Sequence, residues 1–169
     1  MEENHLSVMA HDHVPNQPES NSAKAIAPPL PLYLGTLLIG LTLQWAVPLI
    51  FTPSAYPILG LGLIAAGIAG LRWAFVTMRR AETTASPYKA ASRLTIDGPF
   101  RYSRNPIYVA MTVVYLGIAL LAHSLWLWLL LVPLLLVMQF GVIRREERYL
   151  AARFGTDYTA YCAAVRRWL

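Results

Sequence analysis

The chain has 169 residues, 56% of them hydrophobic, and a formal net charge of +5. The length fits one domain, but this apolar fraction exceeds that of an ordinary soluble domain and indicates a membrane protein. We interpret the positive charge as a topology signal and a contact with anionic headgroups, not as a nucleic-acid interface. The single cysteine, Cys162, excludes an internal disulfide.

Residues 1–30 form a polar, proline-rich segment without apolar periodicity. Such a composition predicts a disordered tail, which we expect on the cytoplasmic side. His5, His11 and His13 lie in this tail, and we do not expect isolated histidines there to form a metal site. The remainder, residues 31–169, is predicted to be one membrane domain.

Four apolar stretches follow the tail, and a membrane-spanning helix needs about 20 such residues. They cover residues 32–51, 56–78, 107–122 and 125–143. The sequence therefore predicts an all-α, polytopic membrane helical bundle, with about four transmembrane helices plus a C-terminal interfacial helix. The third stretch reaches only about 24 Å at 1.5 Å per residue, so two spans with a re-entrant hairpin are the alternative.

Two packing features are expected within the first two spans. Pro48 should kink the first span. Gly62, Ala66 and Gly70 recur every four residues in the second span, which favours close approach of another helix.

The basic residues predict the orientation of the chain. Segment 79–106 carries six Lys and Arg residues and the segment after residue 143 carries six more, whereas the connections 52–55 and 123–124 carry none. Since Lys and Arg in short loops stay on the cytoplasmic side, both termini should be cytoplasmic, as in a bacterial inner membrane. Only Arg72 and His123 are ionisable within spans, which disfavours a transporter.

A polar cluster immediately precedes the third span. Asn105 is a strong N-cap residue and Pro106 suits the first helical position. The free N–H groups at this helix start would favour a carboxylate. Four neighbours add guanidinium donors and aromatic edges, namely Arg101, Arg104, Tyr102 and Tyr108. This pattern predicts a site for a small anionic molecule, and a merely well-capped helix is the alternative.

A second polar cluster follows the fourth span. Arg144 and Arg145 are followed directly by Glu146 and Glu147, at the same end of the helical hairpin as Pro106, so the two clusters should face each other. Gly155 is expected to end this helix. A last helix should follow at the membrane surface, and one face of it should carry Tyr158, Tyr161, Val165 and Trp168. The alternative for the Arg–Glu run is a solvated helix end, and the alternative for the tyrosine stripe is an aromatic belt at the membrane interface.

These two clusters carry a paired motif. The letters G-P-F-R-Y-S-R-N-P-I-Y at 98–108 are followed by the hairpin and then by E-E-x-x-L-x-x-x-F-G-x-x-Y-x-x-Y at 146–161. The pair resembles the integral-membrane methyltransferases, which include isoprenylcysteine carboxyl methyltransferase and the phospholipid N-methyltransferases. The resemblance covers about residues 92–167, and the first two spans match only in being apolar.

The resemblance implies an S-adenosylmethionine site built from helix ends, without a nucleotide-binding Rossmann domain, and no G-x-G-x-x-G occurs here. It implies no metal. Carried over position by position, the cofactor contacts would be Leu94, Thr95, Phe100, Asn105, Pro106, Tyr108 and Glu146. The methionine carboxylate is expected at the helix start and the amine or ribose near Glu146.

This sequence departs from the family pattern at two positions. Relatives usually have His where Asn105 stands, and prenylcysteine-type relatives have Arg where Val142 stands. Arg144 or Arg145 could replace that arginine as a substrate contact, but only from another helical face. The catalytic residues are not determined by the resemblance. The nearby candidates are Glu147, as a base for an amine acceptor, and Arg104.

The sequence therefore predicts transfer of a methyl group from S-adenosylmethionine to a lipophilic or membrane-associated carboxylate, thiol or amine at the cytoplasmic face. The expected partners are the membrane and a lipid or lipophilic small molecule, with no nucleic acid and no obligate protein partner. A non-catalytic membrane scaffold that retains the fold is the alternative, and Asn105 in place of His is its main support.

Overall fold

The computed structural model describes residues 28–50, 56–81 and 94–169, and in these ranges the chain is helical apart from turns and short extended segments. The tail prediction, with its three histidines, falls almost entirely outside the described residues. The all-α prediction is confirmed for the described part. The helices are α1 Pro29–Ala46, α2 Pro57–Arg80, the 3-10 helix η1 Gly98–Arg101, α3 Pro106–Leu121, α4 Leu125–Val137, the π-helix η2 Met138–Ile143 and α5 Arg144–Ala164.

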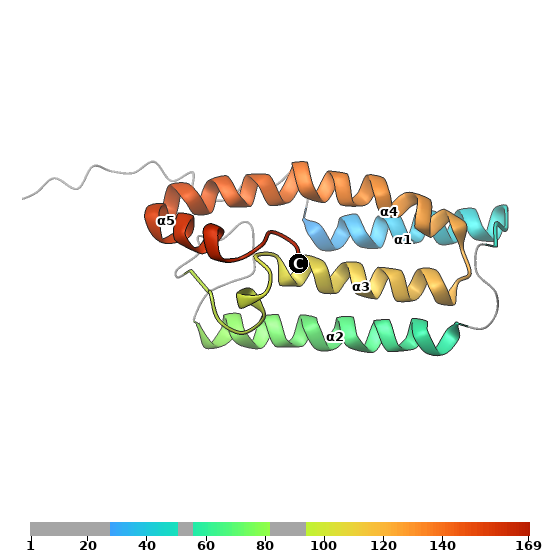
Figure 1. Ribbon diagram of the computed structural model, residues 1–169. Coiled ribbons are helices and arrows are strands. Elements are labelled where there is room, and N and C mark those ends of the chain that lie inside the picture. The colour runs from blue at the N-terminus through green and yellow to red at the C-terminus, as the bar shows by residue number, and fades with distance from the viewer. Residues whose placement is uncertain (1–27, 51–55, 82–93) are drawn as a thin grey trace, which may run out of the picture.

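The long helices run side by side, with α3 between α2 on one side and the α1–α4 pair on the other (Figure 1). Among the described residues, three helices are long and apolar enough to cross a membrane: α1, α2 and the continuous helix Leu125–Ala164. The apolar helix α3 has only 16 residues. We call the end at which α1 and α3 begin and α2 ends the polar end, because α5 lies there (Figure 1) and carries many of the charged residues.

Helices α4, η2 and α5 form one uninterrupted rod up to Gly155 (Figure 1). The wider π turn at Met138–Ile143 brings Met138, Val142 and Ile143, all 0% exposed, onto the face that packs against the other helices. At Gly155 the backbone adopts φ 53° and ψ −121°, so the chain bends there, as expected, but the helix resumes. It ends at Ala164, and Val165 is extended (φ −125°, ψ 134°), so the expected helix through Val165 and Trp168 is wrong.

Helices α2 and α3 approach each other closely through glycines. A Cβ at Gly67 would lie 2.8 Å from the Ala110 carbonyl oxygen, and one at Gly60 would lie 3.0 Å from the Gly117 carbonyl oxygen. Of the predicted stripe of small residues only Gly70 faces α3, where a Cβ would lie 3.3 Å from the Ala110 Cβ, whereas a Cβ at Gly62 would meet no atom within 4 Å. Ala66 is exposed as well. Small residues occur on two faces of α2, and only packing selects between them.

The first span ends earlier than expected. Helix α1 stops at Ala46, so Pro48 follows the helix instead of kinking it. Residues 47–50 are not helical and lead to the start of α4, where the Leu125 N–H donates to the Leu49 carbonyl oxygen (2.9 Å). Trp126 Nε1 donates to the Val47 carbonyl oxygen (2.8 Å). Helices α2, α3 and α4 begin at residues 57, 106 and 125, which agree with the predicted starts of the spans to within one residue.

The buried core lies where α1, α3 and the rod meet. Its side chains include Tyr33, Tyr108, Tyr115, Leu127, Leu131, Leu134, Met138, Val142 and Ile143. Burying such side chains is the main source of stability, at about 25 cal/mol per Å² of apolar surface. The three tyrosines bring hydroxyl groups into this core, and their partners lead toward the polar end.

Candidate functional site at the polar end

The site is assembled from three segments that are distant in sequence. They are the loop 94–105, which we call the site loop, the start of α5, and residues 165–169, which we call the strap. The site loop is held against α2 by a tight turn at Gly98, whose φ is +58° and where a Cβ would lie 2.6 Å from Thr77 Oγ1. A residue other than glycine would be both strained and too close to α2 there.

The acidic cluster meets the start of α3, as the sequence predicts. The Tyr108 hydroxyl is 2.8 Å and 2.9 Å from the two carboxylate oxygens of Glu146 and donates its single hydrogen to them. Glu146 lies beyond the apolar part of the rod, which ends at Ile143. Burial raises the pKa of the Glu146 carboxyl to about 7, although the Tyr108 hydrogen bond opposes this and neighbouring Glu147 adds to it. The result is an inward-facing carboxylate that titrates near neutrality.

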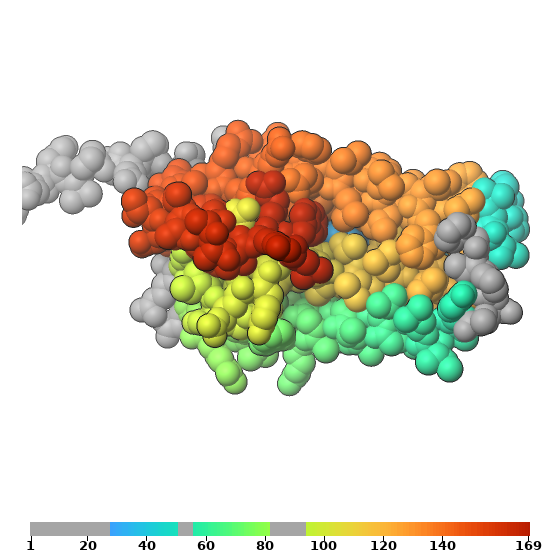
Figure 2. Space-filling model, in the orientation of Figure 1, coloured from blue at the N-terminus to red at the C-terminus, as the bar shows by residue number. Residues whose placement is uncertain are grey.

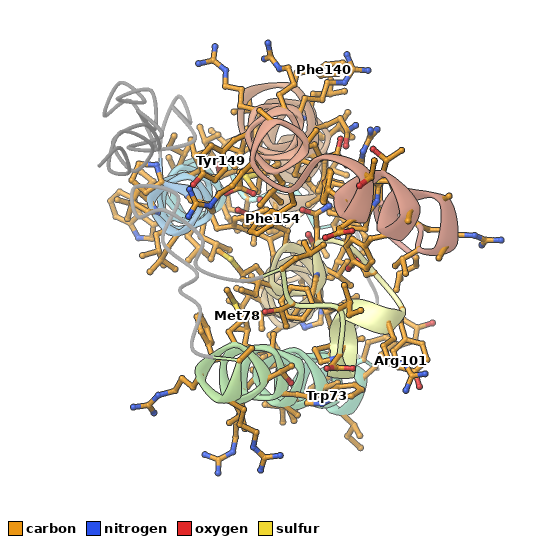
Figure 3. All side chains as sticks on the ribbon, turned by 90° about the vertical axis from the view of Figure 1, so that its left-hand side faces the viewer. Trp73, Met78, Arg101, Phe140, Tyr149 and Phe154 are labelled. Carbon is orange, nitrogen blue, oxygen red and sulfur yellow. The ribbon has the colours of Figure 1, made fainter. Side chains whose placement is uncertain are left out.

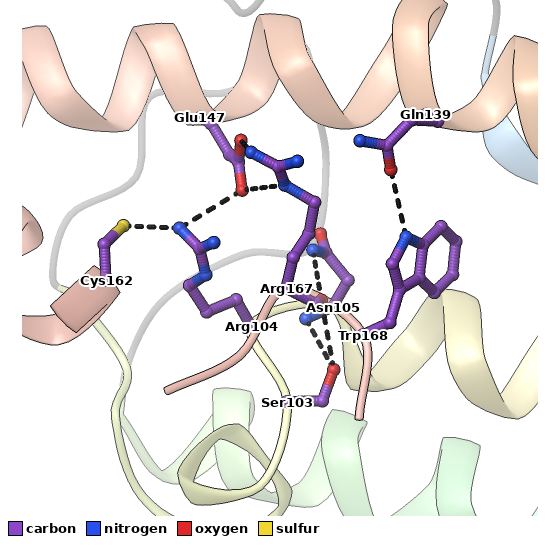
Figure 4. A network of polar contacts seen from close by, with 8 residues as sticks. All are labelled: Ser103, Arg104, Asn105, Gln139, Glu147, Cys162, Arg167 and Trp168. Carbon is purple, nitrogen blue, oxygen red and sulfur yellow. Dashed lines mark hydrogen bonds and ion pairs between the residues drawn. The ribbon is translucent and has the colours of Figure 1, made fainter. Parts of the chain in front are cut away.

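Glu147 lies in a separate network of charged groups (Figure 4). Arg167 donates to both of its carboxylate oxygens, at 2.8 Å and 2.7 Å, and Arg104 Nη1 is 3.2 Å from Oε1. The Glu147 hydrogen bonds also raise the pKa of the Arg167 guanidinium. Arg104 Nη1 donates in addition to Cys162 Sγ. The two candidate catalytic residues, Glu147 and Arg104, are thus paired with each other, and Glu147 binds two guanidinium groups.

The strap covers the junction between the site loop and the rod (Figure 2). Its Arg166 carbonyl oxygen accepts from the Arg104 backbone N–H (2.9 Å), and its Trp168 Nε1 donates to Gln139 Oε1 (3.0 Å). The Arg167 carbonyl oxygen accepts from Asn105 Nδ2 (2.9 Å). The strap therefore forms hydrogen bonds to the site loop on one side and to the rod on the other, and so links the two polar clusters.

Asn105 and Pro106 occupy the positions expected of them, but Asn105 does not cap α3 with its side chain. Pro106 is the first helical residue, and the Asn105 carbonyl oxygen accepts from the Val109 N–H (3.1 Å). No side-chain cap bond forms, because the Asn105 amide is turned toward the strap and its backbone N–H donates to Ser103 Oγ (3.1 Å). The prediction that Asn105 is the N-cap residue is confirmed, but the side-chain bond expected of a cap is absent for this reason.

Several predicted site residues point away from the two clusters. Tyr102 is 69% exposed and lies beside Trp73, with ring centroids 6.2 Å apart. Arg101 is exposed on the outer side of the bundle (Figure 3). Arg144 is also exposed, with its guanidinium 4.4 Å from the centroid of the outward-facing Phe140 ring (Figure 3). The structure thus does not bring Arg101, Tyr102 or Arg144 to the site. Arg145 is half-buried.

The remaining predicted contacts lie on the site loop. Leu94 and Thr95 are half-buried, and Thr95 Oγ1 is a buried hydroxyl without a hydrogen-bond partner. Arg104 Nε is likewise a buried donor without a hydrogen-bond partner. The Phe100 carbonyl oxygen accepts from the Tyr161 hydroxyl (2.7 Å). Tyr158 and Tyr161 are 4% and 9% exposed, so the predicted aromatic stripe packs against the protein.

Sequence reasoning missed the residues that complete the site. Ser103, Gln139 and Arg167 bind across the junction, and Tyr33 of α1 reaches the start of α3. A usable signal existed for Gln139 and Tyr33, since a polar group within an apolar helix needs a buried partner. No comparable signal distinguishes Arg167 from the exposed Arg166.

Comparison with known proteins identifies the family. A family model described as phospholipid methyltransferase matches residues 55–157, which is more than half of the chain and includes both polar clusters. The chain belongs to the phospholipid methyltransferase family. This membership confirms the resemblance found in the motifs, and it indicates a methyltransferase that acts on a membrane lipid.

The chain is also similar to an uncharacterized protein of Haemophilus influenzae. The two are 46% identical over 55 residues, which cover 30% of this chain and 87% of that protein. No solved structure matches the chain.

Proposed function

We propose that this protein transfers a methyl group from S-adenosylmethionine to a membrane lipid or another lipophilic acceptor. The observation that supports this most strongly is the bond between Tyr108 and Glu146, beside the cluster of Glu147 with Arg104 and Arg167. Groups of both charge signs thus lie together at one end of an apolar bundle. Such a site suits a zwitterion that carries an additional positive charge, as S-adenosylmethionine does.

The residues present fit this cofactor. Buried donors without partners are uncommon in folded proteins, and Thr95 Oγ1 and Arg104 Nε would each gain an acceptor from a bound ligand. We propose that Glu146 contacts the amine or ribose, and that Leu94, Thr95, Phe100, Asn105, Pro106 and Tyr108 form the remaining contacts. When bound, the cofactor supplies an electrophilic methyl group on a sulfonium.

The protein's own contribution is orientation. Holding acceptor and methyl carbon in line at contact distance is worth about 7 to 11 kcal/mol in favourable cases. Glu147 is a poor candidate for a base, since both of its oxygens accept from guanidinium groups. We therefore propose that Glu147 and Arg104 position the site loop and strap. This arrangement favours a carboxylate or thiolate acceptor, or an amine that loses its proton to water.

We propose that the polar end faces the cytoplasm and that the protein lies in a bacterial inner membrane. Exposed arginines surround this end: Arg72, Arg79, Arg80, Arg101, Arg144, Arg148, Arg153 and Arg166. Positive residues remain on the cytoplasmic side and are attracted to anionic headgroups there. An apolar acceptor would then reach the site from the bilayer, and the polar cofactor from the cytosol.

Calorimetric titration of the purified protein with S-adenosylmethionine, repeated with S-adenosylhomocysteine, tests the proposal. We expect binding of both, and at least tenfold weaker binding by Glu146→Gln with unchanged folding in detergent. Asp157→Asn, which alters an exposed carboxylate on the same helix, is the matched control and should bind like the wild type. Absence of heat with both ligands would refute the proposed site.

A scaffold that keeps the fold without turnover is the second candidate. The engagement of Asn105 by the strap favours it, because its amide nitrogen already donates to the Arg167 carbonyl oxygen. Mass spectrometry of lipids and small thiols from cells with and without the protein, fed methyl-labelled methionine, separates the two. Labelled products that depend on the protein would exclude the scaffold.

A further inference from the structure

Tyr33 is the residue that connects α1 to the proposed site. It lies in the second turn of the helix and is 3% exposed. Its hydroxyl oxygen is 2.8 Å from Thr112 Oγ1 and 3.4 Å from the Tyr108 carbonyl oxygen. The family match begins at residue 55, so Tyr33 stands outside the matched segment.

The hydroxyl groups form a chain with a defined direction. Thr112 Oγ1 donates its single hydrogen to the Tyr108 carbonyl oxygen at 2.8 Å. The Tyr33 hydroxyl therefore donates to Thr112 Oγ1 as its nearer acceptor, at 2.8 Å, with the Tyr108 carbonyl oxygen as a longer second acceptor, at 3.4 Å. Tyr108 in turn donates from its own hydroxyl to Glu146, so the path runs from α1 through the first turns of α3 to α5.

This path restrains a helix turn that would otherwise be weak. A threonine that bonds to the carbonyl four residues earlier tends to bend a helix, and Thr112 makes that bond to Tyr108. The buried Tyr33 hydroxyl completes the hydrogen bonding there, and its ring stands edge-on to Tyr115, with centroids 6.4 Å apart. Satisfied buried networks of this kind fix one arrangement of side chains.

We propose that Tyr33 is a positioning residue for the proposed cofactor site: through Thr112 it fixes the first turns of α3, so that the Tyr108 hydroxyl stays on the Glu146 carboxylate. The inference rests on the proposed function, since it gives α1 a role in presenting the acidic contact. Helix α1 is then part of the site and not only a membrane anchor.

Tyr33→Phe removes only the hydroxyl group. We expect three- to tenfold weaker binding of S-adenosylmethionine by calorimetry, the range of one net hydrogen bond. Tyr115→Phe is the matched control, because its hydroxyl is equally buried but donates to the Leu127 carbonyl oxygen, outside the path (3.0 Å). The control should bind like the wild type, with a thermal midpoint in detergent close to that of Tyr33→Phe.

Two further comparisons separate positioning from a general packing role. Thr112→Val should weaken binding as Tyr33→Phe does, whereas Thr112→Ser keeps the hydroxyl and should bind like the wild type. In a Tyr108→Phe background the Tyr33→Phe effect should disappear, since the coupled hydroxyl is gone. This pair of threonine variants tests the path even where Tyr33→Phe fails to fold.

The outcomes distinguish this inference from the proposed function. If the wild type does not bind the cofactor, the proposed site itself fails. If the wild type binds and Tyr33→Phe binds equally well, or loses as much affinity in the Tyr108→Phe background as in the wild type, Tyr33 is only a core residue and the inference is overturned.

Discussion

The α2–α3 contact and the polar end are held together in opposite ways. In the first, glycines let two backbones meet, and a Cβ at Gly117 would lie 2.6 Å from the Gly60 carbonyl oxygen. In the second, side chains from three segments meet through hydrogen bonds and ion pairs centred on Glu146 and Glu147. Packed backbones offer no side-chain group that could bind a ligand instead. Hydrogen-bonding and charged side chains can exchange a partner in the protein for a ligand.

This difference predicts a division of effects. Substitutions at the α2–α3 contact should alter the free energy of unfolding with no specific effect on ligand binding. Substitutions at the polar end should alter ligand affinity more than they alter folding.

The largest expected effect is on the glycine contact. Gly67→Ala places a methyl group 2.8 Å from the Ala110 carbonyl oxygen and 2.9 Å from the Val114 nitrogen, so the helices must separate. We expect a loss of about 3 kcal/mol in the free energy of unfolding in detergent. Gly62→Ala, which would meet no atom within 4 Å, is the control and should not destabilise the protein. Equal stability of the two variants would contradict the observed helix register.

The next largest effect is expected at Tyr108. Tyr108→Phe leaves the Glu146 carboxylate without its donor, and hydrogen bonds to charged groups are worth about 1.5 to 3 kcal/mol. We expect cofactor affinity to fall about thirtyfold in calorimetric titration, with a smaller change in the thermal midpoint. A variant that loses stability but keeps full affinity would place this pair with the structural contacts.

The pH dependence should be about tenfold. The Glu146 pKa is raised to about 7, so the carboxylate that attracts a cationic ligand forms as pH rises from 6 to 8, and binding should strengthen. The effect on the ligand-free fold has the opposite sign. Because the ordinary pKa of 4.5 lies below the folded one, the stability from protonated Glu146 is lost between about pH 4.5 and 7. Glu146→Gln should abolish this component of the pH profile, and persistence of the full profile would assign it to another group.

The smallest effect is expected at the strap. Arg167→Met removes the bidentate bond to Glu147, but the Arg167 side chain is 35% exposed and solvent weakens the pair. We expect a loss of about 1 kcal/mol or less in the free energy of unfolding. Arg166→Met is the matched control, because only the Arg166 backbone carbonyl takes part in the strap. A destabilised control would show that the strap depends on overall charge.

The sequence was sufficient to predict the helical class, the starts of α2, α3 and α4, and the meeting of the two clusters. Apolar runs set the helix boundaries, and a short connection at His123 and Ser124 forces α3 and α4 to be antiparallel neighbours, so Tyr108 and Glu146 come to the same end. This reasoning needs only chain length and helix geometry.

The direction of individual side chains could not be predicted. Asn105 had the local signal of a cap, but a carbonyl 62 residues away took its amide. Arg101 and Arg167 are both arginines in segments that help to form the site. Only Arg167 reaches Glu147, because of the path that the strap takes. The face of α2 that packs on α3 was predicted only at Gly70 for the same reason, since Gly62 and Gly67 differ only in what packs against them.

The π-helix has a consequence for how tolerant this rod is to changes in length. Successive residues of an α-helix are rotated by about 100°, and the wide turn at Met138–Ile143 absorbs an additional residue between the membrane segment and the two glutamates. Deleting one residue there should restore ordinary helical winding and leave both carboxylates facing the bundle, whereas deleting one residue from the neighbouring α-helical part would rotate them by about 100°. The direction in which the two glutamates point should therefore tolerate the loss of one residue in the π-helix but not in the ordinary helix beside it.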